Sequence, residues 1–178
     1  MSTPPDELLK RDSMPLQRSL QRVMNNLNRT LERDELVQKT TDLIRNQLQV
    51  DRVLLYYFYN QWQGQVTFES LSSPSLSILG STGPDKCFQD EYAVLYLQGR
   101  VKATNDIELE PIQECHRDFL RGLQVRANLV APVLTAKGLW GLLIAHQCQS
   151  VHSWSSADIE CLEKGAKTLA TADSIRGS

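Results

Sequence analysis

The sequence contains no hydrophobic run long enough to span a membrane, and its start, Met1 to Asp12, is mostly polar. A membrane helix needs about 20 mostly apolar residues and a signal peptide needs an apolar core, so we expect neither in this segment. The formal net charge is only −2. Because nucleic acids and anionic membranes are bound mainly through positive charge, the composition gives no reason to expect either partner.

Cysteine and histidine are also scarce, with four and three residues respectively. The cysteines have irregular spacing, unlike the disulfide framework of a small secreted domain, so we expect free thiols in a reducing cytoplasm. No Cys-Xaa-Xaa-Cys pair and no histidine pair at helical spacing occurs. The neighbours Cys115 and His116 would diverge by about 100° on a helix. The sequence therefore predicts no metal site, and it also lacks a glycine-rich phosphate-binding motif.

A chain of 178 residues with 41% hydrophobic residues is typical of one soluble globular domain. We assign this domain to residues 15–178 and predict that residues 1–14 form a disordered or weakly ordered lead-in. Apolar residues at three- and four-residue steps predict a helix over 16–31 and another over 36–48, for which Asp34 is a plausible cap. Both stripes are typical of core packing. The first helix precedes the compact part, however, and could instead pair with the same helix of a second copy in a homodimer.

Two pairs of strands are predicted, each pair joined by a short glycine-containing turn. The predicted strands are 52–59, 65–69, 127–134 and 139–147. Between the pairs we expect a loop (71–84) and two short helices (89–98 and 113–123), and a last helix is expected after Ser155 or Ser156. Strand pairs framed by helices indicate an α+β fold, in which an antiparallel sheet carries helices on one face and loops on the other.

Two short stretches, Asp85-Lys86-Cys87-Phe88 and Cys115-His116, point to a family. With Arg126-Ala127-Asn128-Leu129-Val130 and the strand 139–147, they resemble the GAF photosensory domains of cyanobacteriochromes, which are relatives of phytochromes that bind a linear tetrapyrrole, or bilin. The resemblance covers about Leu16 to Ala170. It implies the GAF fold, with a ligand pocket under the loops and short helices. The first stretch matches the Asp-Xaa-Cys-Phe motif of the dual-cysteine subgroup.

The resemblance implies a role for each cysteine of these motifs. Cys115 matches the cysteine that attaches the bilin through a permanent thioether, a role that suits a thiolate as a carbon nucleophile. Cys87 matches the second cysteine, which adds reversibly to the middle of the bilin and shortens its conjugated system. Asp85 is expected near the pyrrole nitrogens. Read without the family, Cys115 could be a small buried apolar residue and Cys87 a loop thiol.

Four more residues are expected to contact the bilin by the same resemblance. His116 and His146 match histidines that lie against the chromophore, and Phe88 is a candidate ring neighbour. Arg100 is the best candidate to pair with a propionate, because a guanidinium fork suits a carboxylate. From the residues alone, His146 could equally be a core histidine and Arg100 a solvated surface residue. Cys148 and Cys161 match no motif and are expected to be structural.

The resemblance therefore implies a photoreceptor domain that holds phycocyanobilin or phycoviolobilin. It would convert between a violet- or blue-absorbing state and a longer-wavelength state, and it would act with output domains of a larger receptor. No enzymatic activity is expected beyond autocatalytic attachment and isomerisation of the bilin. Two alternatives share the fold: a GAF domain that binds a small ligand such as a cyclic nucleotide, and a GAF-type methionine sulfoxide reductase.

Overall fold

The protein is described from a computed structural model that covers residues 6–60, 62–83 and 90–177. Over these ranges a six-stranded sheet has the order β3-β2-β1-β6-β5-β4, and every neighbouring pair is antiparallel. The strands are β1 (Arg52–Asn60), β2 (Gln63–Leu71), β3 (Thr82–Gly83), β4 (Lys102–Thr104), β5 (Ala127–Thr135) and β6 (Gly138–Gln147). The helices are α1 (Asp6–Leu48), α2 (Asp90–Leu97), α3 (Glu114–Gly122), α4 (Ser156–Thr171) and α5 (Asp173–Arg176), with a 3-10 turn η1 (Pro74–Leu76).

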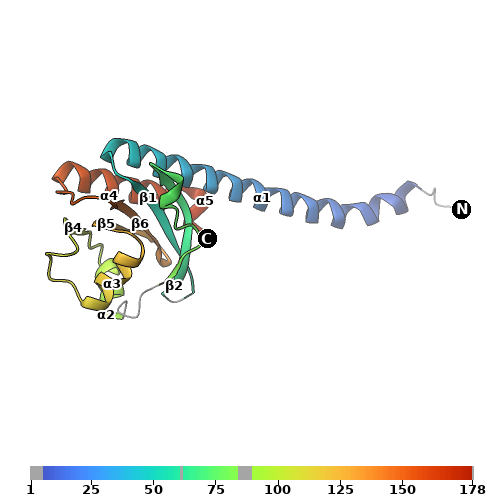
Figure 1. Cartoon of the computed structure of the whole chain (residues 1–178). Helices are drawn as coiled ribbons and strands as arrows, with labels where there is room; N and C mark the ends of the chain where they lie inside the picture. Colours follow the sequence, from blue (N-terminus) through green and yellow to red (C-terminus); the bar gives the residue numbers. More distant parts are fainter. Residues whose placement is uncertain (1–5, 61, 84–89, 178) are drawn as a thin grey trace, which may run out of the picture.

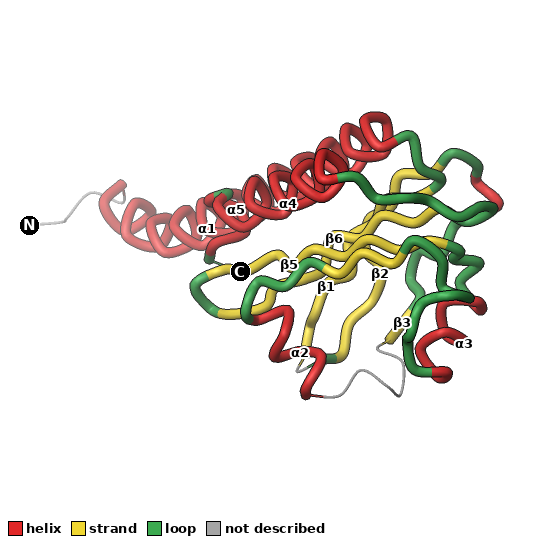
Figure 2. Tube along the Cα trace, turned by 90° about the vertical axis from the view of Figure 1, so that its left-hand side faces the viewer, coloured by secondary structure: helices red, strands yellow, loops and turns green. Residues whose placement is uncertain are grey.

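The helices divide between the two faces of the sheet. The C-terminal half of α1, with α4 and α5, covers one face, while α2, α3 and the long loops lie over the other (Figures 1 and 2). The predicted α+β class is confirmed, as is an antiparallel sheet with helices on one face and loops with short helices on the other. Ser155 caps α4 with a capping box in which Asp158 takes part, as the sequence suggested.

The core lies between the sheet and the α1–α4 layer. Strand side chains alternate between the faces, so Val53 and Leu55 of β1 point into this core. They meet Ile44 of α1 and Leu162 of α4, which are also buried. Full burial of each such aliphatic side chain stabilises the fold by about 1.5–3 kcal/mol. Gly165 lets α4 approach α1, because a Cβ there would lie 2.5 Å from Ile44 Cδ1.

The N-terminal helix differs from its prediction. The two helices expected over 16–31 and 36–48 form the single helix α1, which already begins at Asp6 within the segment predicted to be weakly ordered. Residues 32–35 contain no glycine or proline, and Asp34 binds Arg33 at 3.0 Å instead of starting a second helix. Figure 1 shows the first half of α1 projecting away from the sheet.

An arginine–carboxylate pair shapes the loop that leads from β4 to α3. Arg126 donates through Nε and Nη2 to the two carboxylate oxygens of Asp106, at 2.8 and 2.9 Å. The backbone N–H of Glu108 donates to the same carboxylate at 3.0 Å. The hydrogen bond from Arg126 is the main cause that lowers the pKa of Asp106 from 3.8 to about 2. Asp106 therefore stays charged well into the acid range, and its hydrogen bonds keep the loop in place over the same range.

This pair predicts a specific loss of stability in acid. A lowered folded-state pKa stabilises the protein above the unfolded pKa, and the contribution disappears as the pH falls through the folded value. Asp106→Asn is expected to lower the free energy of unfolding at neutral pH. The difference in free energy of unfolding between this variant and the parent is expected to shrink as the pH falls from 3.8 to about 2. Urea unfolding followed by tryptophan fluorescence over a pH series measures the difference.

The control is Asp173→Asn, because the Asp173 side chain is fully exposed. The free energy of unfolding of that variant is expected to equal that of the parent at every pH. A difference between Asp106→Asn and the parent that stays constant down to pH 2 would contradict the assigned role of this carboxylate.

Candidate functional site

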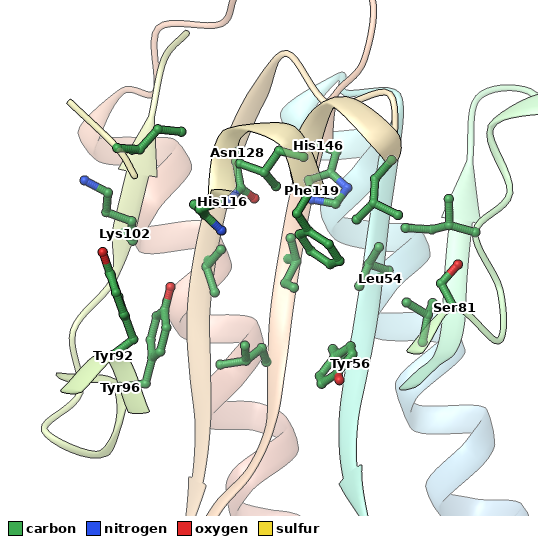
Figure 3. A pocket seen from close by; sticks show the side chains of 18 of the residues that line it. Leu54, Tyr56, Ser81, Tyr92, Tyr96, Lys102, His116, Phe119, Asn128 and His146 are labelled. Carbon is green, nitrogen blue, oxygen red and sulfur yellow. The ribbon is translucent and has the colours of Figure 1, made fainter. Parts of the chain in front are cut away.

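A cavity of about 320 Å³ lies on the sheet face opposite α1 and α4. Figure 3 shows its lining side chains in front of the sheet, with those helices behind. The floor comes from β1, β2, β5 and β6, and the walls come from α2, α3 and the adjoining loops. The lining is mostly apolar and includes Leu54, Val66, Val130, Leu142 and Ile144. A concave, largely apolar cavity with a few polar groups is typical of a small-molecule site.

Three polar side chains lie in a row across neighbouring strands, and two of them, Asn128 and His146, line the cavity. Strand register places Arg52 of β1 and Asn128 of β5 on either side of His146 of β6. All three are buried, and Arg52 Nε donates to His146 Nδ1 at 3.1 Å. Burial, followed by the charge of Arg52, lowers the pKa of His146 well below its ordinary value. His146 is therefore a neutral imidazole in the cavity.

Another group of polar residues surrounds the α2 side of the cavity. Tyr92 and Tyr96 of α2 and Lys102 of β4 lie together there in Figure 3. The Arg100 guanidinium lies over the Tyr96 ring at 5.3 Å, which is within cation–π range. Arg100 Nε is buried and has no hydrogen-bond partner among the residues that the structure describes. A buried cationic donor without a partner suits an anionic group of a ligand.

Helix α3 supplies the wall that carries the predicted attachment residue. His116 and Phe119 are three residues apart, so they share the face that lines the cavity, and their rings stack at 6.5 Å. Cys115 is exposed in the first turn, next to His116, and its sulfur is part of a disulfide. The free thiol expected from the sequence at this position is therefore not what the structure shows. Arg117 anchors the helix by donating to the carbonyls of Ile107 and Glu110, at 2.7 and 3.0 Å.

The structure thus places three predicted contact residues, Arg100, His116 and His146, in the lining of one cavity, with Cys115 beside it. The predicted residues Asp85, Cys87 and Phe88 lie outside the described residues. The remaining cysteines, Cys148 and Cys161, are free, and burial raises the pKa of both thiols. A raised thiol pKa lowers nucleophilicity at neutral pH, in agreement with the structural role expected for them.

Sequence reasoning did not assign a role to Arg52, Asn128 or Lys102, which also belong to this site. Arg52 carried a usable signal, because it is a charged residue at the start of an otherwise apolar strand. A charged side chain that is buried in a strand needs hydrogen-bond partners. For Arg52 these are His146 and the carbonyls of Leu76 and Leu123, on the cavity side of the sheet.

Other site types find no support over the described ranges. No group of three or more histidine, cysteine or acidic side chains there is arranged to hold a metal ion. None of the helices described in the structure is both long and apolar enough to cross a membrane.

The sequence matches known proteins over most of its length. Residues 32–172 match the GAF domain family. An uncharacterized protein of Picosynechococcus sp. strain PCC 7002 is 52% identical over 153 residues, which are 86% of this chain and 94% of that protein. The circadian input-output histidine kinase CikA of Synechocystis sp. strain PCC 6803 is 31% identical over 86% of this chain. The match spans only 24% of CikA.

Solved structures agree with these matches. The blue-light absorbing form of the Thermosynechococcus elongatus PixJ GAF domain has a TM-score of 0.75 and 34% identity, covering 81% of this chain and 86% of that one. PixJ is a cyanobacteriochrome receptor. A phycoerythrobilin-bound GAF domain from a cyanobacterial phytochrome has a TM-score of 0.74 and 25% identity, covering 93% of this chain and 97% of that one. The chain therefore belongs to the GAF domain family, and it matches the GAF domains of cyanobacteriochromes and phytochromes.

Proposed function

We propose that this chain is a photoreceptor domain that binds a linear tetrapyrrole through Cys115 and changes its absorption on illumination. One observation carries the proposal: α3 presents an exposed cysteine directly beside a histidine that lines the cavity. The similarity to the blue-light absorbing PixJ domain and to a phycoerythrobilin-bound domain supports the same class of ligand. Phycocyanobilin and phycoviolobilin are the two candidates.

The polar groups of the cavity fit a bilin. Its propionates need cations, and the buried Arg100 Nε and Lys102 provide them. Its pyrrole N–H groups need acceptors, and Asn128 Oδ1 is buried without a partner among the described residues. His116 supplies an imidazole face to the ring system. When bound, the bilin supplies absorption of visible light and a double bond that isomerises under light.

The residues of the chain would prepare the attachment. Cys115 lies in the first turn of α3, where the positive end of the helix dipole would stabilise its thiolate once the disulfide is reduced. A thiolate adds to an unsaturated carbon without an external catalyst, so attachment would be autocatalytic. Attachment needs a reduced thiol, so we propose that the Cys115 disulfide is first reduced, as it would be in a reducing cytoplasm.

Loss of the Cys115 thiol is expected to abolish covalent attachment. Cys115→Ala, coexpressed with a bilin-producing pathway, is expected to show no zinc-induced fluorescence on a denaturing gel, whereas the parent is fluorescent. Cys148→Ala is the matched control, because its thiol is partly buried outside the cavity lining and is expected to leave the band unchanged.

An undiminished band from Cys115→Ala would overturn the attachment site. A parent that stays colourless after coexpression would favour the alternatives, and binding of a cyclic nucleotide or reduction of methionine sulfoxide would then distinguish them.

We further propose that Cys87 forms the second, reversible thioether, which keeps one state violet- or blue-absorbing, with Asp85 near the pyrrole nitrogens and Phe88 against a ring. Cys87→Ala is expected to keep its bilin through Cys115 but to lose the short-wavelength state, because no sulfur remains to interrupt the conjugation. Absorption spectra before and after illumination measure this. A short-wavelength state that persists in Cys87→Ala refutes the second linkage and leaves the first intact.

An exposed apolar stripe lies on the projecting half of α1. Large apolar side chains there are 55–64% exposed, and six of them share one stripe of the helix: Leu16, Leu20, Val23, Met24, Leu27 and Leu31. Within the described ranges the helix projects past the sheet, so the compact part does not cover the stripe (Figure 1). We propose that a second copy of the chain pairs with it, since identical stripes are self-complementary. We also propose that the chain works with the output domains of a larger receptor. The histidine kinase CikA is an example of such a receptor.

Disruption of the stripe is expected to give a monomer. Leu20→Glu with Leu27→Glu places charge in the centre of the proposed seam, and sedimentation equilibrium measures the mass. The control pair, Arg18→Gln with Arg29→Gln, changes the net charge by the same amount on the opposite side of the helix and is expected to stay dimeric. A monomeric parent, or a dimer that survives both glutamates, contradicts this interface.

A further inference from the structure

Arg52 is a fully buried cation whose hydrogen bonds go to neutral acceptors. Its guanidinium donates to His146 Nδ1 at 3.1 Å and to the carbonyls of Leu76 and Leu123. No carboxylate of the described part of the chain forms an ion pair with it. A buried charge is costly, and an aliphatic side chain could fill the same core position. The three contacts therefore point to a role beyond packing.

The contact with His146 determines where the histidine proton lies. An arginine Nε–H can only donate, so His146 Nδ1 must accept and carries no proton. The single proton of the neutral ring is therefore on Nε2. Protonation of Nδ1 would break this hydrogen bond and place two cations together in a buried site.

The other side of the ring belongs to the cavity. His146 lines the cavity, and Figure 3 places it beside Asn128 at one end. With Nδ1 held by Arg52, Nε2–H is the polar group that remains for a ligand. Asn128 Oδ1, on the neighbouring strand, is a buried acceptor that lacks a partner within the described residues. This end of the cavity thus offers one donor and one acceptor side by side.

We propose that Arg52 is a positioning residue that fixes His146 as the Nε2–H tautomer, so that the cavity always presents a hydrogen-bond donor to a ligand carbonyl oxygen. The inference deepens the proposed function and rests on it for the ligand, because a bilin carries such carbonyls on its terminal rings. The tautomer itself depends only on the protein. A histidine that never becomes an acceptor or a cation keeps the same preference for its ligand at every pH near neutrality.

The charged groups around this pair favour the same state. Arg52 on β1 is the cation that lowers the pKa of His146, after burial. Burial lowers the pKa of Arg52, whereas the charges of Cys148 after β6, Glu69 on β2 and Asp51 act in the opposite direction and favour its charged form. The cavity wall opposite contributes His116 from α3, and Lys102 and Arg100 lie on the β4 side. None of these wall groups is a carboxylate that would stabilise a histidine cation.

Nitrogen NMR of the chain labelled at histidine tests the proposal without any ligand. The chain has only three histidines, so His116→Gln and His152→Gln leave the His146 signals identifiable by subtraction. His146 is expected to show a protonated Nε2 and an unprotonated Nδ1, with no titration between about pH 5 and 8, where an ordinary histidine changes charge. A protonated Nδ1, or a titration in that range, overturns the proposal.

The variant Arg52→Met keeps the volume of the side chain but removes the donor and the charge. We expect a second population of His146, either the other tautomer or the cation, and a pH-dependent absorption band in the chromophore-loaded protein. Arg45→Met loses a cation whose Nε binds Ser70 Oγ outside the cavity lining, and it is expected to keep the parent pattern. An unchanged His146 pattern in a folded Arg52→Met also refutes the role of Arg52.

The two proposals fail separately. If Arg52→Met does not fold, the NMR of the parent decides the inference. If the parent shows the expected tautomer but Cys115 attaches no bilin, the proposed function fails and the role of Arg52 stands. If bilin attaches but Nδ1 is protonated, only the inference fails.

Discussion

The alternation of side chains along each strand is the constraint on which the rest of the structure depends. On β1, Val53 and Leu55 pack against the helices, while Arg52 and Leu54 face the other side. The same alternation on β5 and β6 makes one face of the sheet a core and the other the floor of a cavity. A shift of register by one residue would bury Arg52 among aliphatic side chains and leave His146 without its partner. Stability and the site therefore require the same register.

Arginine side chains that bind backbone carbonyls hold the cavity walls in place. Arg52 joins β1 to η1 and to the turn after α3, and Arg117 ties α3 to the preceding loop. Arg126 closes that loop through Asp106. Loops expose backbone acceptors that no helix or strand satisfies, and a guanidinium with five donors can satisfy several at once. This explains how a wall without regular structure still positions His116 accurately.

Local patterns predicted the long elements well, because a strand of nine or ten residues shows its period clearly. They did not predict β3 or α5, and they indicated β4 only as a short strand or extended piece somewhere in 100–111. These elements have two to four residues and are formed by their neighbours. Asp34 resembled a helix cap, but no breaker near it interrupts α1. At the site, motifs pointed to Cys115, His116 and His146, and the two histidines line the cavity. Arg52 was missed because its partner is 94 residues away, and only the strand register brings the two together.

The position of β1 connects the cavity with α1. Leu54 lines the cavity, and its neighbours Val53 and Leu55 belong to the core that contains Ile44 of α1. One strand backbone therefore separates a ligand from the helix, and a close-packed interior transmits a displacement of that backbone instead of absorbing it. Because α1 is a single helix from Asp6 to Leu48, no break separates its packed half from its projecting half. A continuous path of packed side chains and helix backbone therefore runs from the cavity floor to the exposed apolar stripe, and a pair of separate helices would have interrupted it.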